Sequence, residues 1–215
     1  MQDWIGKLFE DPDLTRMGHG QSLADLNLGL GWIYYALARS LCPTRAVVIG
    51  SYRGFVPLVL GKAMQDNGNG EVIFLDPSLV DDFWAEPARV QAHFEGYGVR
   101  NIRHFRATTQ EFVGSSAYHE LAGVGILFVD GYHTAEQAQF DHEAFSPKMT
   151  ESGVALFHDS ARERLSRIYG VDRAYTHTVC RYIDRLRSKP GYEVLTLGVA
   201  DGLAVVRRCS HNGLL

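Results

Sequence analysis

The residues best placed for chemistry lie where short apolar runs end, and the first of them are two glycines. In VVIGSYRG at 47–54, a strand-like run leads into Gly50 and Gly54 and then into a predicted helix. A glycine in such a turn lets the backbone approach a ligand, and the N-terminus of a helix favours a carboxylate or phosphate. The spacing is GxxxG rather than the GxGxxG dinucleotide fingerprint, so an ordinary strand-to-helix turn remains an alternative.

An aspartate ends the next strand-like run, in FLDPS at 74–78. Asp76 lies 26 residues after Gly50, about where a Rossmann-type site places an acid that binds ribose hydroxyls. An ordinary aspartate that caps a loop is the alternative. Together, Gly50 and Asp76 predict a cofactor site at one edge of a sheet.

A third motif, FVDGYH at 128–133, combines an acid with a histidine. Asp130 follows a strand predicted at the centre of the sheet, and His133 follows at the start of the next predicted helix. A histidine beside an acid at the active edge suits a general base. A purely structural histidine is the alternative.

The fourth motif, LFHDS at 156–160, brings His158 and Asp159 to the end of the neighbouring strand. Two carboxylates that converge from adjacent strand ends, Asp130 and Asp159, suit an oxygen-liganded ion such as Mg²⁺. A histidine at the same point would also tolerate Mn²⁺ or Zn²⁺. In the structural alternative, His158 caps the strand and Asp159 caps a following helix, and both interpretations stay open.

An alternation of strands and helices must position these motifs. We expect strands at 46–49, 71–75, 101–105, 125–129, 153–158, 192–197 and 202–208, and helices at 23–40 (capped by Ser22), 54–65, 85–96, 110–120, 134–149 and 175–187. This order predicts an α/β fold with a mostly parallel seven-stranded sheet and helices on both faces. Only GVAD at 198–201 joins the last two strands, which permits an antiparallel hairpin and forbids a parallel crossover.

Composition limits the classes of protein. A chain of 215 residues fits one α/β domain, and a net charge of −4 argues against non-specific binding of nucleic acid. The three cysteines are scattered and form no CxxC pair, which favours a reducing cytoplasm over a disulfide framework. The first residues, MQDWIGKLFEDPD, do not resemble a signal peptide, and no apolar run is long enough to span a membrane.

In this order, the four motifs resemble a known family over residues 20–208. VVIGSYRG, EVIFLDPS, ILFVDGYHTAEQAQFDHEAFSPKMTESGVALFHDS and GLAVVRR look like class I S-adenosylmethionine (SAM)-dependent O-methyltransferases, in the group of macrolide-sugar methyltransferases and cephalosporin-hydroxylase-like proteins. Catechol O-methyltransferase is a more distant relative. The resemblance implies a Rossmann-like SAM-methyltransferase fold at 41–210, preceded by a helical lead-in or lid at 1–40, with one domain overall.

The resemblance also implies roles for individual residues. The glycine turn would hold the methionine end of SAM, the aspartate after the second strand its ribose, and the two threonines of RATT its adenine. The implied cofactor-binding residues are Gly50, Ser51, Tyr52, Gly54, Asp76, Pro77, Thr108, Thr109 and Asp130. Asp130, Asp159 and His158 would hold a divalent metal, and His133 aligns with the catalytic base.

Three positions depart from the family pattern. Val48 and Thr108 stand where an acid is common, and His158 and Ser160 flank Asp159 where another acid or an asparagine is common. A non-catalytic or hydroxylase-like protein on the same fold is therefore the alternative function.

The expected reaction is O-methylation of a small molecule, sugar-like or natural-product-like, with SAM and a divalent cation such as Mg²⁺ as cofactors. The lead-in and the basic, aromatic segment 161–176 are expected to form the acceptor pocket, although a solvated loop would have the same composition. We expect no nucleic-acid or membrane partner, and the chain is a candidate homo-oligomer.

Overall fold

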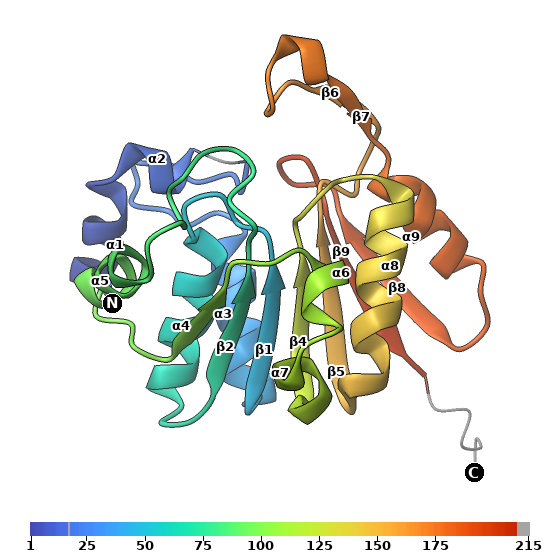
Figure 1. The fold of residues 1–215 in the computed structure, drawn as a ribbon, viewed down its shortest axis with the longest axis horizontal. Coiled ribbons are helices and arrows are strands. Elements are labelled where there is room, and N and C mark those ends of the chain that lie inside the picture. Colours follow the sequence, from blue (N-terminus) through green and yellow to red (C-terminus); the bar gives the residue numbers. More distant parts are fainter. Residues whose placement is uncertain (17, 210–215) are drawn as a thin grey trace.

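Seven strands form one sheet in the computed structural model, which describes residues 1–16 and 18–209 (Figure 1). The strand order is β3-β2-β1-β4-β5-β9-β8. The parallel strands are β1 (Arg45–Ile49), β2 (Glu71–Leu75), β3 (Ile102–Phe105), β4 (Val124–Val129) and β5 (Met149–His158). β8 (Tyr192–Leu197) and β9 (Leu203–Arg208) complete the sheet as an antiparallel pair. The predicted fold class is confirmed.

Helices cover both faces, so the sheet separates two apolar cores. The first core contains residues of α1 (Gln2–Phe9), α2 (Pro12–Thr15), α3 (Gly31–Leu41), α4 (Phe55–Asp66) and α5 (Pro87–Gly96). The second contains residues of α6 (Thr109–Phe112), α7 (Ser116–Glu120), α8 (Ala135–Phe145) and α9 (Val179–Arg187). Successive side chains of a strand point to opposite faces, so in β1 Ala46 and Val48 enter the first core while Val47 and Ile49 enter the second.

The helix expected at 23–40 begins later, at Gly31, and its predicted cap is wrong. Leu26 and Gly29 have positive φ angles of 49° and 58°, which a right-handed helix excludes. A Cβ atom on Gly29 would lie 2.2 Å from the carbonyl oxygen of His19, so the two turns pack directly together. Ser22 instead forms a bridge with Asn27. The apolar residues of this loop are spaced as in a helix because the loop, too, contributes residues to the first core.

The helix expected at 175–187 begins at Val179, since Tyr175–His177 forms a strand instead. This strand, β7, pairs with β6 (Arg164–Ser166), and the short helix η2 (Val171–Arg173) joins them. The hairpin, here called the arm, stands above the carboxyl ends of the parallel strands, in orange in Figure 1. The basic segment is therefore an ordered two-stranded element.

Two other helices are shorter than expected. Residues 110–120 form two short helices, α6 and α7, with Gly114 between them, and α8 ends before Pro147. Proline lacks the N–H that a continuing helix needs, so η1 (Ser146–Lys148) follows and β5 begins at Met149. No helix of the described part of the chain is both long and apolar enough to cross a membrane.

Candidate active site

The carboxyl ends of β1, β2, β4 and β5 open into one cavity of about 710 Å³. In an open α/β sheet, ligands bind outside the carboxyl ends of the strands, which is this edge. The cavity is lined by these predicted site residues: Gly50, Ser51, Tyr52, Asp76, Pro77, Thr108, Thr109, Asp130, His133, His158 and Asp159. Both the lead-in and the arm also contribute lining residues, among them His19 and Arg164.

Gly54 is the predicted cofactor residue that lies outside the lining. Its φ angle is +84°, and a Cβ atom there would lie 2.9 Å from the ring of Phe94 and 3.1 Å from that of Trp84. Position 54 thus requires glycine, because the start of α4 packs against Trp84, which precedes α5, and against Phe94 within α5. Packing by itself requires a glycine here, and the cofactor-binding role of Gly54 stays a prediction.

Gly50 follows β1 and packs closely against the backbone at the end of β4. Its φ angle is +71°, and a Cβ atom would lie 2.3 Å from the backbone oxygen of Asp130. The Asp130 N–H in turn donates to the carbonyl of Ile49. This close approach holds the glycine turn directly beside the carboxylate of the central strand.

Asp76 lines the same cavity directly after β2. Its Oδ1 accepts from the N–H of Ser78 at 2.8 Å, and burial raises its pKa to about 6. Val48, which stands where an acid is common in the family, is fully buried in the first core. Val48 and Ile49 point to opposite faces of β1, so the side chain at position 48 lies in the apolar core and supplies no acid to the cavity.

The threonines of RATT lie at the start of α6. The Thr108 hydroxyl caps this helix by accepting from the N–H of Glu111, and the Glu111 carboxylate accepts from the N–H of Thr108. This capping box fixes the turn. Thr109 is buried beside it and lines the cavity, so both threonines are held in rigid positions.

His158 is surrounded by oxygen atoms. Its Nδ1 lies 3.0 Å from Asp130 Oδ1 and its Nε2 lies 3.2 Å from the carbonyl oxygen of Gly18. Burial lowers the pKa of His158, but Asp130 and Asp159 outweigh burial and raise it to about 9. His158 therefore carries a proton on each ring nitrogen and donates to both neighbours.

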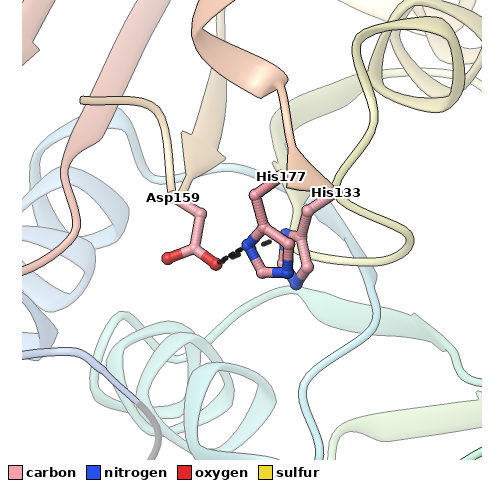
Figure 2. Close-up of side chains that lie close together, drawn as sticks. All are labelled: His133, Asp159 and His177. Atoms are coloured by element: carbon pink, nitrogen blue, oxygen red, sulfur yellow. Dashed lines mark ion pairs between the residues drawn. The ribbon is translucent and has the colours of Figure 1, made fainter. Parts of the chain in front are cut away.

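Asp159, His133 and His177 form a second cluster, shown in Figure 2. Asp159 Oδ2 lies 2.8 Å from His177 Nδ1 and 3.7 Å from His133 Nδ1, and the two imidazoles stack with centroids 4.2 Å apart. The contact of His177 falls outside hydrogen-bond geometry, so within residues 1–16 and 18–209 neither of its ring nitrogens has a hydrogen-bond partner.

His133 is a neutral imidazole of this site. Burial lowers its pKa to about 4, against the raising effect of Asp130 and Asp159. Its Nε2 lies 3.9 Å from Asp130 Oδ1, so the ring stands between two carboxylates. A neutral imidazole in this position can accept a proton and have the resulting charge stabilised on both sides.

The arm adds two residues to which the sequence assigned no role. β6 and β7 pair Arg164 directly with His177, and side chains of directly opposed residues lie on the same face of the ribbon. Arg164 Nη2 reaches Asp159 Oδ2 at 2.6 Å. Arg164 lies in the basic segment and His177 directly follows it, but only the register of this hairpin directs them to Asp159.

The lead-in also contributes a residue to the site, His19, which lies against His158. Its ring lies 4.4 Å from that of His158 and 5.1 Å from that of Phe55, and its Nδ1 is 3.1 Å from the hydroxyl of Tyr34. Burial, together with the charge of His158, lowers the pKa of His19 to about 3. A neutral His19 thus covers His158 from the side of the lead-in.

Comparison with known proteins identifies the family. Residues 47–160, more than half of the chain, match the sequence profile of a family described as a methyltransferase domain. The chain belongs to this methyltransferase family. The matched region contains all four motifs of the cavity, and the predicted class I SAM-dependent methyltransferase family is confirmed.

Similar proteins agree in fold. Protein y4gI of Sinorhizobium fredii is 30% identical over 158 residues, which are 71% of this chain but span only 16% of that protein. A structure from Corynebacterium glutamicum has a TM-score of 0.67 at 17% identity, covering 98% of this chain and 92% of its own. The O-methyltransferase TomG of Streptomyces achromogenes, solved with SAM, has a TM-score of 0.64 at 14% identity, covering 97% and 88%.

Proposed function

We propose that this methyltransferase transfers the methyl group of SAM to a hydroxyl of a small-molecule acceptor, sugar-like or natural-product-like. The observation that carries the proposal is the neutral imidazole of His133, which stands between Asp130 and Asp159 in the same cavity as Gly50 and Asp76. The cavity thus unites a proton acceptor with the residues that the family uses for its cofactor.

On the cofactor side, the glycine turn and Asp76 would hold SAM. Gly50 and Ser51 would lie along its methionine end, Asp76 would accept from the ribose hydroxyls, and Thr109 would flank the adenine. When bound, SAM supplies a methyl group on a positively charged sulfur. Since the transfer is an in-line displacement, holding both reactants in line contributes much of the rate.

On the acceptor side, His133 would take the hydroxyl proton on a ring nitrogen. Asp130 and Asp159 favour the imidazolium against the effect of burial. Tyr132, Tyr169 and Tyr175 form one wall of the cavity, where the rings of Tyr132 and Tyr175 stack at 4.4 Å. These residues of the arm and of the β4–α8 turn would position the acceptor and exclude water.

The residues of the site do not favour the cation predicted on Asp130, Asp159 and His158. Both nitrogens of His158 face oxygen atoms, so a protonated His158 has no lone pair for a metal. The ligand atoms of His133, Asp159 and His177 lie within 4.8 Å of one another, but Arg164 already holds the shared Asp159 oxygen. With Arg164 in place this donor set does not fit a cation, and the proposed steps use none.

Calorimetry with SAM, S-adenosylhomocysteine and NAD tests the cofactor. We expect binding of the first two, and binding of neither would refute the proposal. NAD binding alone would favour an oxidoreductase, and SAM binding without methyl transfer to any sugar or phenol tested would favour a non-catalytic domain.

His133→Gln tests the base, with His119→Gln on the exposed helix α7 as the matched control. Turnover, followed by release of S-adenosylhomocysteine, should fall roughly 10²–10⁴-fold in His133→Gln while SAM affinity is unchanged. The control should behave as the wild type. Normal turnover in His133→Gln would show that another group takes the proton.

A further inference from the structure

Arg164 is the arm residue that enters the reaction centre. Its Nη2 lies 2.6 Å from Asp159 Oδ2 and its Nε lies 3.8 Å from Asp201 Oδ2. The buried Nε–H has no hydrogen-bond partner among the described residues. The guanidinium thus binds the buried carboxylate with one nitrogen and keeps a further donor available at the cavity wall.

The two carboxylates of the centre are already matched by two positive charges. Asp130 faces His158, whose two ring nitrogens both face oxygen atoms and so both carry hydrogen. Asp159, which is 2% exposed, faces Arg164. Each buried charge therefore has an opposite charge within hydrogen-bond distance, as burial requires.

A divalent cation would upset this balance. Added to the present groups, it would leave an excess of positive charge in a site where charges are largely removed from water, and desolvation makes such an excess costly. The ion would also compete with Arg164 for Asp159, because Oδ2 is the oxygen nearest to His133, His177 and Arg164 alike. Arg164 and a metal ion are alternatives at this carboxylate.

We infer that the guanidinium of Arg164 takes the place of the divalent cation beside Asp159, so that the wild-type protein holds no metal there. The arm supplies this charge, since the pairing of Arg164 with His177 directs both side chains to Asp159. The arm therefore completes the electrostatics of the site. The consequence that methyl transfer proceeds without a metal rests on the proposed function, whereas the exclusion of metal does not.

The inference predicts that removing the charge of Arg164 creates a metal site. Arg164→Gln leaves the Asp159 carboxylate beside the two imidazoles, a two-histidine, one-carboxylate set that suits transition ions. Arg164→Lys keeps the positive charge and should stay free of metal. Arg162→Gln changes an exposed arginine two residues away and serves as the matched control.

Calorimetric titration with Mn²⁺ and with Zn²⁺ tests this on the full chain. Arg164→Gln should bind one ion about 10- to 100-fold more tightly than the wild type, Arg164→Lys or Arg162→Gln. Adding His177→Ala to Arg164→Gln should abolish the gain. SAM titration of the same samples tests the proposed function separately. Absence of SAM binding, with each variant binding metal as expected, would refute that function alone.

Two results would overturn the inference. One is a wild-type protein that binds one Mn²⁺ or Zn²⁺ ion and loses it in His177→Ala, a result that needs no folded Arg164 variant. The other is an Arg164→Gln protein with a wild-type circular dichroism spectrum that gains no metal binding.

Discussion

Replacing Gly50 by alanine should destabilise the protein much more than the same change at Gly68. The two glycines have nearly equal φ angles, +71° and +74°, so alanine meets the same left-handed backbone strain at both, about 1–2 kcal/mol. They differ in their surroundings. A Cβ atom on Gly50 would lie 2.3 Å from the oxygen of Asp130, whereas on Gly68 it meets no atom of the described residues within 4 Å.

The clash at Gly50 involves backbone, which cannot rotate away as a side chain can. Overpacking of this kind adds about 1–3 kcal/mol. The expected loss of unfolding free energy is therefore about 2–5 kcal/mol for Gly50→Ala and about 1–2 kcal/mol for Gly68→Ala. Urea denaturation measures both values, and thermal unfolding should separate the variants by about 2–4 °C for each kcal/mol. Equal losses would refute the close approach of β1 and β4 at Gly50.

Two further predictions concern buried polar groups. Burial raises the pKa of Asp141 to about 6, so the folded protein binds a proton that the unfolded chain releases, and this contribution to stability is lost as pH rises from about 4 to about 6. Over this pH range, the unfolding free energy of Asp141→Asn, measured by urea denaturation, should therefore rise relative to that of the wild type. An equal rise in the exposed variant Asp82→Asn would contradict the assignment of the raised pKa to Asp141. Tyr182→Phe should cost about 1–3 kcal/mol by the same measurement, because the Tyr182 hydroxyl lies 2.7 Å from the buried Nδ1 of His142. Tyr35→Phe, which loses a bond to the exposed Asp66, should cost less, and the reverse order would show that the His142 contact stabilises little.

The local pattern of the sequence was sufficient for the sheet and for the strand ends. Buried strands of apolar residues alternate with helices, and GVAD is too short for a parallel crossover, so the parallel sheet and its terminal hairpin were predictable. Asp76, Asp130 and Asp159 follow strands, and parallel strands bring their carboxyl ends to one edge. Their gathering at the cavity followed from that topology.

The errors fell where packing overrides periodicity. The apolar spacing at 23–30 is that of a helix, yet Gly29 and Leu26 have positive φ angles and the loop packs against His19. No local pattern contains such contacts.

The sequence by itself determined the methyltransferase fold and the acids and histidine at its strand ends, because strand length, helix period and connection length are local properties. Only the tertiary structure decided what surrounds Asp159. Arg164 and His177 reach it through the register of the β6–β7 hairpin, and His19 reaches His158 from the lead-in. These contacts depend on how separate segments pack in space, and they determine whether the carboxylates meet a metal ion or the charge of an arginine.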